Sequence, residues 1–221
     1  CHTPRDARGG ELGNTAYLAG ALVDGWQAPP LGALTRSPVP WTEAALVQYL
    51  QRGHHAEHGI AGGSMAPVVR ALAQAPLADV QAMAHYLVSL QPAAPAVDAR
   101  AVVAHTARTH TAPLGPAQRM FEAACGACHH EGDGPQLLGQ NHPLALNSTL
   151  HADQPDNLVR TILLGIQQPA FAEIGHMPAF GQALDDRQIA ELAGWMRQRF
   201  APQQPAWPDL PAAVARLRAA P

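Results

Sequence analysis

Two cysteines and a histidine near the middle of the chain form a C-x-x-C-H pattern: Cys125, Cys128 and His129. This spacing lets both thiols form thioethers with the two vinyl groups of one porphyrin, and the adjacent imidazole can then ligate the iron. A zinc site would need a second Cys/His pair, and a thioredoxin-like site would need a βαβ pattern. Neither is visible, so the motif predicts covalently attached haem c. A structural thiol pair and a disulfide are the alternatives.

A methionine loop downstream is expected to supply the second axial ligand. Met177 lies between Gly175 and Pro178, and the proline stiffens the backbone after it. Thioether sulfur opposite histidine is a known haem ligand pair. We therefore predict His129 and Met177 as the axial ligands. His176 is the rival ligand, and a methionine that fills a gap in the core is the alternative interpretation.

The first residues of the chain match the end of a second motif of the same kind. Cys1-His2 is what remains of C-x-x-C-H if its first three residues are missing, and Met65 follows in another loop that glycine precedes and proline follows. We predict a second haem, bonded to Cys1 and ligated by His2 and Met65. The alternative is an acylated lipoprotein cysteine at position 1.

Helical periodicity and capping residues predict the elements around these ligands. The expected helices are 42–52 and 77–90 in the first half and 116–124, 156–164 and 185–200 in the second. Each half has the order haem motif, helix, methionine loop, helix, which indicates a weak repeat. No convincing strand alternation appears, so the fold class is all-α. Trp195 and Phe200 are expected to pack against the haem edge or the 116–124 helix.

The length of 221 residues suits two domains of ordinary size. Residues 91–113 are rich in Pro, Ala, Thr and His, which is typical of a linker. We predict tandem cytochrome c-like domains at 1–91 and 114–200, a Pro/Ala-rich linker at 92–113, and a C-terminal tail at 201–221. The tail can end in a short helix, but we expect it to pack loosely.

Three histidines lie close together at positions 54, 55 and 58. Residues spaced i and i+4 share a helical face, an arrangement that suits a metal ion. Gly53 and Gly59 bracket the cluster, however, so we expect a solvated loop near the Met65 face of the haem.

Charge and hydropathy exclude some classes of function. The formal net charge is −3, and all 14 basic residues are arginine, with no basic stripe that would bind nucleic acid. No apolar run reaches the length of a transmembrane helix. Haem attachment to C-x-x-C-H takes place outside the bacterial cytoplasm. We expect a periplasmic protein at the outer face of the cytoplasmic membrane, attached by a partner, a missing N-terminal part or the tail.

The chain resembles the multihaem cytochrome c subunit of bacterial membrane-associated dehydrogenases. Residues 41–43, 63–66 and 83–90 resemble the middle one of that family's three haem domains, and residues 121–129 and 177–181 resemble the third. The resemblance implies a cytochrome c fold, two haems here and a third possible haem upstream.

The resemblance also implies electron transfer. Electrons would pass from a catalytic dehydrogenase subunit (molybdenum/iron–sulfur, quinoprotein or flavoprotein) through successive Met/His-ligated haems to quinone or a terminal oxidase. No catalytic residue is expected, because protein ligands fill both axial positions. The alternatives are a haem enzyme, such as a dihaem peroxidase or a thiosulfate-oxidising cytochrome, and a haem subunit of a terminal oxidase.

Overall fold

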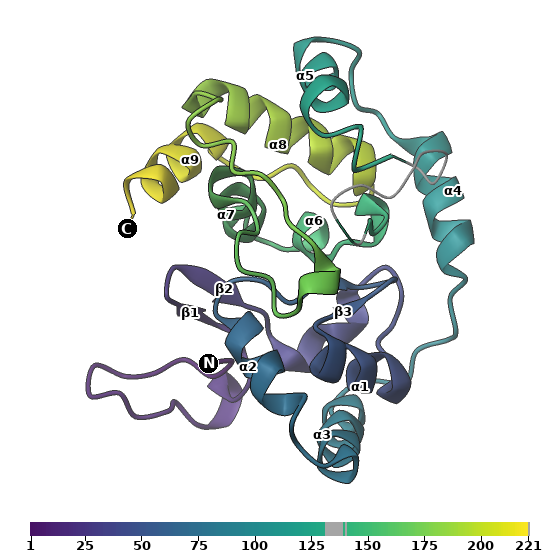
Figure 1. Cartoon of the computed structure of the whole chain (residues 1–221), viewed down its shortest axis with the longest axis vertical. Coiled ribbons are helices and arrows are strands. Elements are labelled where there is room, and N and C mark those ends of the chain that lie inside the picture. The colour runs from purple at the N-terminus through teal and green to yellow at the C-terminus, as the bar shows by residue number, and fades with distance from the viewer. Residues whose placement is uncertain (131–138, 140, 221) are drawn as a thin grey trace.

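The computed structural model describes residues 1–130, 139 and 141–220, and these residues are mostly helical (Figure 1). The first half of the chain lies at the bottom of the view, and the second half lies above it. The helices are α1 (Glu43–Arg52), α2 (Met65–Leu72), α3 (Leu77–Ser89), α4 (Ala99–Thr109), α5 (Pro116–Ala124), α6 (Ser148–His151), α7 (Asp156–Leu164), α8 (Asp186–Phe200) and α9 (Leu210–Ala219). Short 3-10 helices occur at Asn14–Ala16, Leu31–Arg36, Leu144–Leu146 and Ala172–Ile174.

All five helices predicted from the sequence are confirmed, with ends within one residue of the expected positions. Their boundaries follow local capping chemistry. Thr42 Oγ1 accepts a hydrogen bond from Ala45 N at 3.1 Å, and Gly53 ends α1 in the left-handed region with φ +72°. Asp185 and Gln188 form a reciprocal capping box at the start of α8.

Two short β-hairpins depart from the all-α expectation. β1 (Ala21–Val23) pairs antiparallel with β2 (Trp26–Ala28), and β3 (His54–His55) pairs with β4 (Gly59–Ile60). Asp24 and Gly25 connect the first pair with φ values of +49° and +79°, as a two-residue hairpin turn requires. Strands of two or three residues are too short for alternation to be seen in a sequence.

The segment expected to be a linker contains an ordered helix. α4 lies within 92–113, and its N-cap is Asp98, whose side chain accepts from Arg100 N at 2.9 Å. The helix contacts residues 144–146 and α8, and Thr106 is buried. The Pro/Ala-rich composition gave no sign of this helix, which packs against the second half.

The C-terminal tail is also packed, contrary to expectation. α9 contacts α7 and α8, and Val214 and Leu217 are buried among the apolar side chains of the second half. Arg216 donates to both carboxylate oxygens of Asp156, at 3.0 and 3.1 Å. Arg218 donates to the carbonyls of Gly181 and Leu184. These partners are more than 30 residues away in sequence, so composition alone could not reveal them.

The main core fills the second half, and its aromatic centre joins α5 to α8. The Phe121 ring lies 5.1 Å from Trp195 and 5.4 Å from Phe200, between ring centroids. This confirms the predicted contact of both α8 aromatic residues with the 116–124 helix.

A smaller set of buried side chains, which we name the shared cluster, joins the two halves. Its members are Ala61, Ala66, Val69, Ala170 and Ile174. Polar contacts add to it: Gln27 N donates to Asn157 Oδ1 at 2.9 Å, and Asn157 Nδ2 donates to Gln27 O at 2.8 Å. The first and second halves therefore pack against each other. Among the described helices, none is long and apolar enough to cross a membrane.

The packing of α9 can be tested by truncating one side chain. Leu217→Ala should lower the free energy of unfolding by about 2–5 kcal/mol, because Leu217 is buried against α7 and α8. Leu114→Ala is the control, since Leu114 is 85% exposed, and should change it by no more than about 0.5 kcal/mol. Denaturant unfolding of the haem-loaded protein measures both. Equal effects would show that the tail packs loosely.

Candidate haem sites

The C-x-x-C-H segment forms a tight turn at the end of α5. Cys125 N and Gly126 N both donate to Phe121 O at 2.8 Å, and His129 N donates to Cys125 O at 2.8 Å. A Cβ at Gly126 would lie 2.9 Å from Glu122 O, so this position requires glycine. These bonds hold both cysteines and the histidine on one turn, beside the aromatic core.

The chemistry of these side chains fits haem c. Cys125 and Cys128 are separate, half-buried thiols rather than a disulfide. Burial, and secondarily Cys128, raises the pKa of Cys125 to about 11. Burial lowers the pKa of His129, and its Nδ1 is buried without a hydrogen-bond partner. Two free thiols next to an imidazole are the donor set that a covalent haem needs.

Met177 is fixed by backbone bonds to the end of α7. Ile166 N donates to Met177 O at 2.9 Å, and Met177 N donates to Ile166 O at 3.2 Å. Gly165 has φ +66°, and a Cβ there would lie 2.2 Å from Met177 O. Three residues further on, Phe180 N donates to Ile162 O at 2.9 Å. The methionine segment is therefore held on both sides.

Met177 and its neighbour His176, the rival ligand, differ in exposure. Met177 is half-buried, whereas His176 is exposed. Phe180, in the same segment, packs against the main core, and so does Cys125. The methionine segment and the cysteine motif thus pack against one core.

In the first half, His2 is oriented by a backbone acceptor. His2 Nδ1–H donates to Pro29 O at 2.7 Å, and His2 O accepts from Gly20 N at 2.8 Å. Burial lowers the pKa of His2. The bond to Pro29 places the ring proton on Nδ1 and leaves the lone pair of Nε2 for a metal, as outer contacts commonly do for ligating histidines. Cys1, beside it, is an exposed free thiol.

Met65 is the first residue of α2, not part of a loop as expected. Its position depends on the β1–β2 hairpin: Ser64 Oγ donates to Asp24 Oδ2 at 3.0 Å, and a Cβ at Gly63 would lie 2.5 Å from the Trp26 ring. The hairpin leads on to Pro29, the acceptor for His2. One hairpin therefore positions both His2 and the Met65 segment.

Sequence reasoning missed this hairpin and the acceptor role of Pro29. The available signal was Asp24-Gly25, since Asp-Gly between apolar residues is a strong hairpin indicator. A carbonyl acceptor has no side-chain signature, so the role of Pro29 required the structure.

Histidines from both halves meet at the β3–β4 hairpin. The His54 and His142 rings stack with centroids 5.6 Å apart. Burial, followed by the charges of His54 and His55, lowers the pKa of His142 to about 4. Burial also lowers the pKa of His58 to about 3. The expected solvated loop is therefore wrong, because His58 is only 3% exposed.

Comparisons with known proteins agree with this chemistry. A family model described as cytochrome c oxidase, cbb3-type, subunit III matches residues 112–196. Over its whole length, the chain is 47% identical to a nicotinate dehydrogenase subunit of Pseudomonas putida, of which it spans 18%. It is 30% identical to the fructose dehydrogenase cytochrome subunit of Gluconobacter japonicus, over 90% of the chain and 45% of that protein. It is 32% identical to the gluconate 2-dehydrogenase cytochrome c subunit of Pantoea cypripedii, over 89% of the chain and 48% of that protein.

The matched residues contain a cytochrome c domain, whose cofactor is haem c. Over about nine-tenths of its length the chain is thus similar to cytochrome c subunits of bacterial dehydrogenases. It spans less than half the length of each relative named above.

Stability should depend on pH through the buried histidines. A histidine whose folded pKa is lowered stays neutral in the folded chain while the unfolded chain binds a proton below about pH 6.5, so stability falls with acid. For His142, with a folded pKa of about 4, this loss spans roughly pH 6.5 to 4.

His142→Gln should therefore reduce the slope of the unfolding free energy against pH by about 1 kcal/mol per pH unit near pH 5. Leu114→Ala is the control, because this 85% exposed side chain carries no titratable group, and it should leave the slope unchanged. Denaturant unfolding at several pH values gives both slopes. An unchanged slope in His142→Gln would contradict the lowered pKa.

Proposed function

We propose that this chain is an electron-transfer subunit that carries two haem c groups in tandem domains, at 1–91 and 114–200. Cys125 and Cys128 hold one haem, with His129 and Met177 as axial ligands. Cys1 holds the other, with His2 and Met65 as axial ligands. When bound, each haem supplies a one-electron iron couple, and the protein tunes its potential through ligands and burial.

The main support is the way Met177 is fixed beside the core against which Cys125 of the C-x-x-C-H motif also packs. Its segment is bonded to Ile162 and Ile166, while His129 leaves the end of α5 with an unpartnered Nδ1. With His129 and Met177 both as ligands, the iron would have no position left for a substrate. A methionine ligand also raises the potential relative to two histidines.

The shared cluster supports transfer between the two sites. Met65 packs against it from the first half, and Ile174, three residues before Met177, is one of its members. Both methionine segments thus pack on one set of apolar side chains. We expect this packing to hold the two haem sites at a fixed separation.

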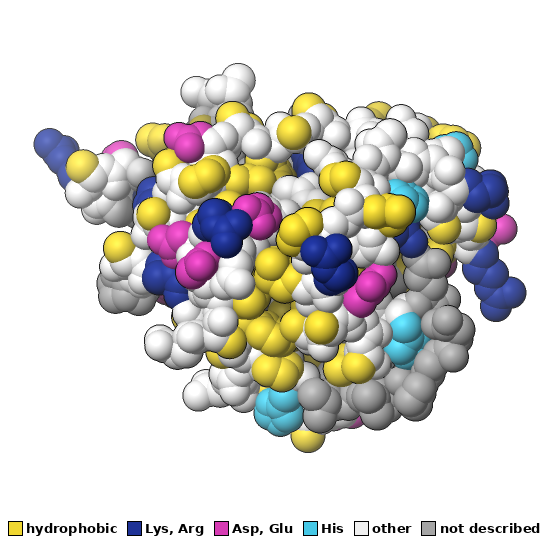
Figure 2. Space-filling model, turned by 90° about the horizontal axis from the view of Figure 1, so that it is seen from above, with side chains coloured by type: hydrophobic (Ala, Val, Ile, Leu, Met, Phe, Trp, Pro, Cys, Tyr) yellow, Lys and Arg dark blue, Asp and Glu magenta, His cyan; other side chains and the backbone are white. Residues whose placement is uncertain are grey.

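The names of the relatives support a dehydrogenase complex as the setting. The electron donor would be a catalytic dehydrogenase subunit, and the acceptor would be quinone or a terminal oxidase. Such a complex lies in the periplasm, at the outer face of the cytoplasmic membrane. Seen from above, the described surface carries basic and acidic side chains beside each other with apolar side chains between them, a mixture that suits a protein partner better than nucleic acid (Figure 2).

Met177→Ala should convert one haem to a high-spin form and lower its reduction potential, because the iron loses its sulfur ligand. His176→Ala, at the exposed neighbour, is the matched control and should leave the spectrum and potential unchanged. Absorption spectroscopy with redox titration measures both properties. If only His176→Ala produced the change, the axial ligand would be His176.

The complete complex should reduce both haems when the substrate of its catalytic subunit is added. Replacing Cys125 and Cys128 together with serine should remove one covalent haem and interrupt transfer to the acceptor, while the catalytic subunit still reduces an artificial dye. Haem-stained gels and stopped-flow absorbance provide the readouts. A stable high-spin haem that binds peroxide in the unmodified protein would instead favour a haem enzyme.

A further inference from the structure

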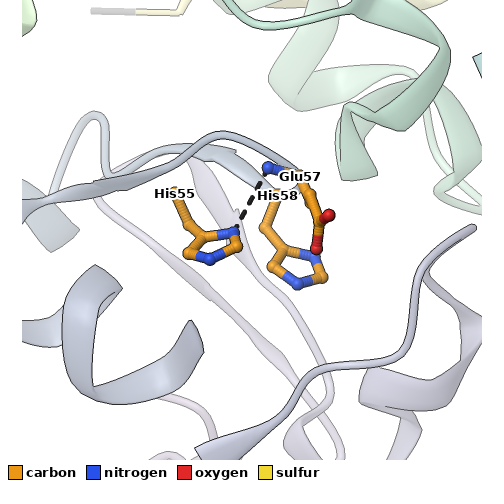
Figure 3. A group of neighbouring side chains, drawn as sticks. All are labelled: His55, Glu57 and His58. Atoms are coloured by element: carbon orange, nitrogen blue, oxygen red, sulfur yellow. Dashed lines mark hydrogen bonds between the residues drawn. The ribbon is translucent and has the colours of Figure 1, made fainter. Parts of the chain in front are cut away.

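The β3–β4 hairpin gathers three potential metal ligands at one tight turn: His55, Glu57 and His58 (Figure 3). β3 ends at His55 and β4 begins at Gly59, so the turn comprises residues 56–58. His58 N donates to His55 O at 3.1 Å, and Gly59 has φ +91°. The backbone geometry of the hairpin therefore fixes the three residues relative to one another.

The side chains of these residues are close enough to share an ion. One potential ligand atom from each residue lies within 4.8 Å of the others. In a tetrahedral zinc site with ligands near 2.1 Å from the ion, neighbouring ligand atoms lie about 3.4 Å apart. Small side-chain rotations would close this difference. Two imidazoles and a carboxylate are a known donor set for zinc with one position left for water.

His58 supplies an independent sign that a ligand is needed. The residue is 3% exposed, and its Nε2 is buried without a hydrogen-bond partner. Its Nδ1 lies 3.3 Å from Ser37 Oγ, and its ring stacks on Trp41 with centroids 3.7 Å apart. With the proton on Nδ1, donated to Ser37, the ring is held in place and Nε2 presents its lone pair.

His55 can join the same ion at small cost. Its Nδ1 accepts one long hydrogen bond, from Glu57 N at 3.2 Å. If Nδ1 binds the ion, its lone pair is no longer free to accept this bond. If Nε2 binds the ion, the ring proton lies on Nδ1, which then cannot accept either. The turn thus offers two imidazoles and one carboxylate for coordination.

We propose that His55, Glu57 and His58 bind a divalent first-row transition ion, with Zn²⁺ as the expected ion. None of the three is a candidate ligand of either haem iron. The ion would fix the β3–β4 hairpin, whose His54 stacks on His142 of the second half. The same donors would bind Cu²⁺ more tightly wherever that ion is available.

Calorimetric titration of the chelator-treated, haem-loaded protein with Zn²⁺ tests the proposal. One zinc ion should bind per chain, and Glu57→Gln and His58→Gln should each weaken binding by at least about tenfold. His85→Gln is the control, because His85 forms an exposed pair with Glu43 and should bind zinc as the unmodified chain does. This readout does not depend on electron transfer.

Haem content and absorption spectra verify that each variant is folded. If His58→Gln does not fold, zinc binding by Glu57→Gln tests the proposal instead, because Glu57 is half-buried and glutamine has nearly the same shape as glutamate. No stoichiometric zinc binding in the unmodified chain, or undiminished binding in Glu57→Gln, would overturn the proposal. Loss of binding in His54→Gln alone would also overturn it, since the ion would then lie between His54 and His142.

Discussion

The contact between α2 and residues 170–174 is the interaction on which the arrangement of the two halves depends. Val69 and Ile174 are almost fully buried there, and burial of apolar surface is the main favourable term for such an interface. The contact is close enough to restrict the chain: a Cβ at Gly53 would lie 3.0 Å from Ile174 and 3.1 Å from Ala170. Met65 begins α2 and Met177 follows Ile174, so this contact positions both proposed sulfur ligands together.

Predictions from the sequence succeeded where the signal was local. Thr42 with Gly53, and Asp185 with Gln188, mark helix ends within a few residues, and the five predicted helices are confirmed. Predictions failed where distant partners decide the structure. Arg216 donates a hydrogen bond to Asp156, 60 residues away in the sequence, and this bond helps to hold α9 against α7. The Pro/Ala-rich composition of this segment had indicated a loosely packed tail. The helix within the segment 92–113 was not foreseen for the same reason, because it packs on residues 144–146 and α8.

In the candidate sites, too, local motifs could be read from the sequence, whereas contacts with distant residues could not. The C-x-x-C-H spacing and the Gly/Pro-flanked methionines could be recognised from the sequence alone, and their assignment as haem ligands stays a prediction. The structure adds what orients them: Pro29 O for His2, and the backbone of Ile166 for Met177. It also changes the interpretation of the histidine cluster. Burial of His58 under Trp41 arises from tertiary packing, which the flanking glycines could not indicate.

Near-infrared magnetic circular dichroism of the oxidised, haem-loaded protein, with the haem content per chain measured in parallel, tests the account most directly. This spectroscopy separates iron ligated by histidine and methionine from iron with two histidines or an open position. We predict two covalent haems per chain, both with histidine and methionine as ligands. A single haem, or a haem whose iron lacks sulfur, would contradict the account.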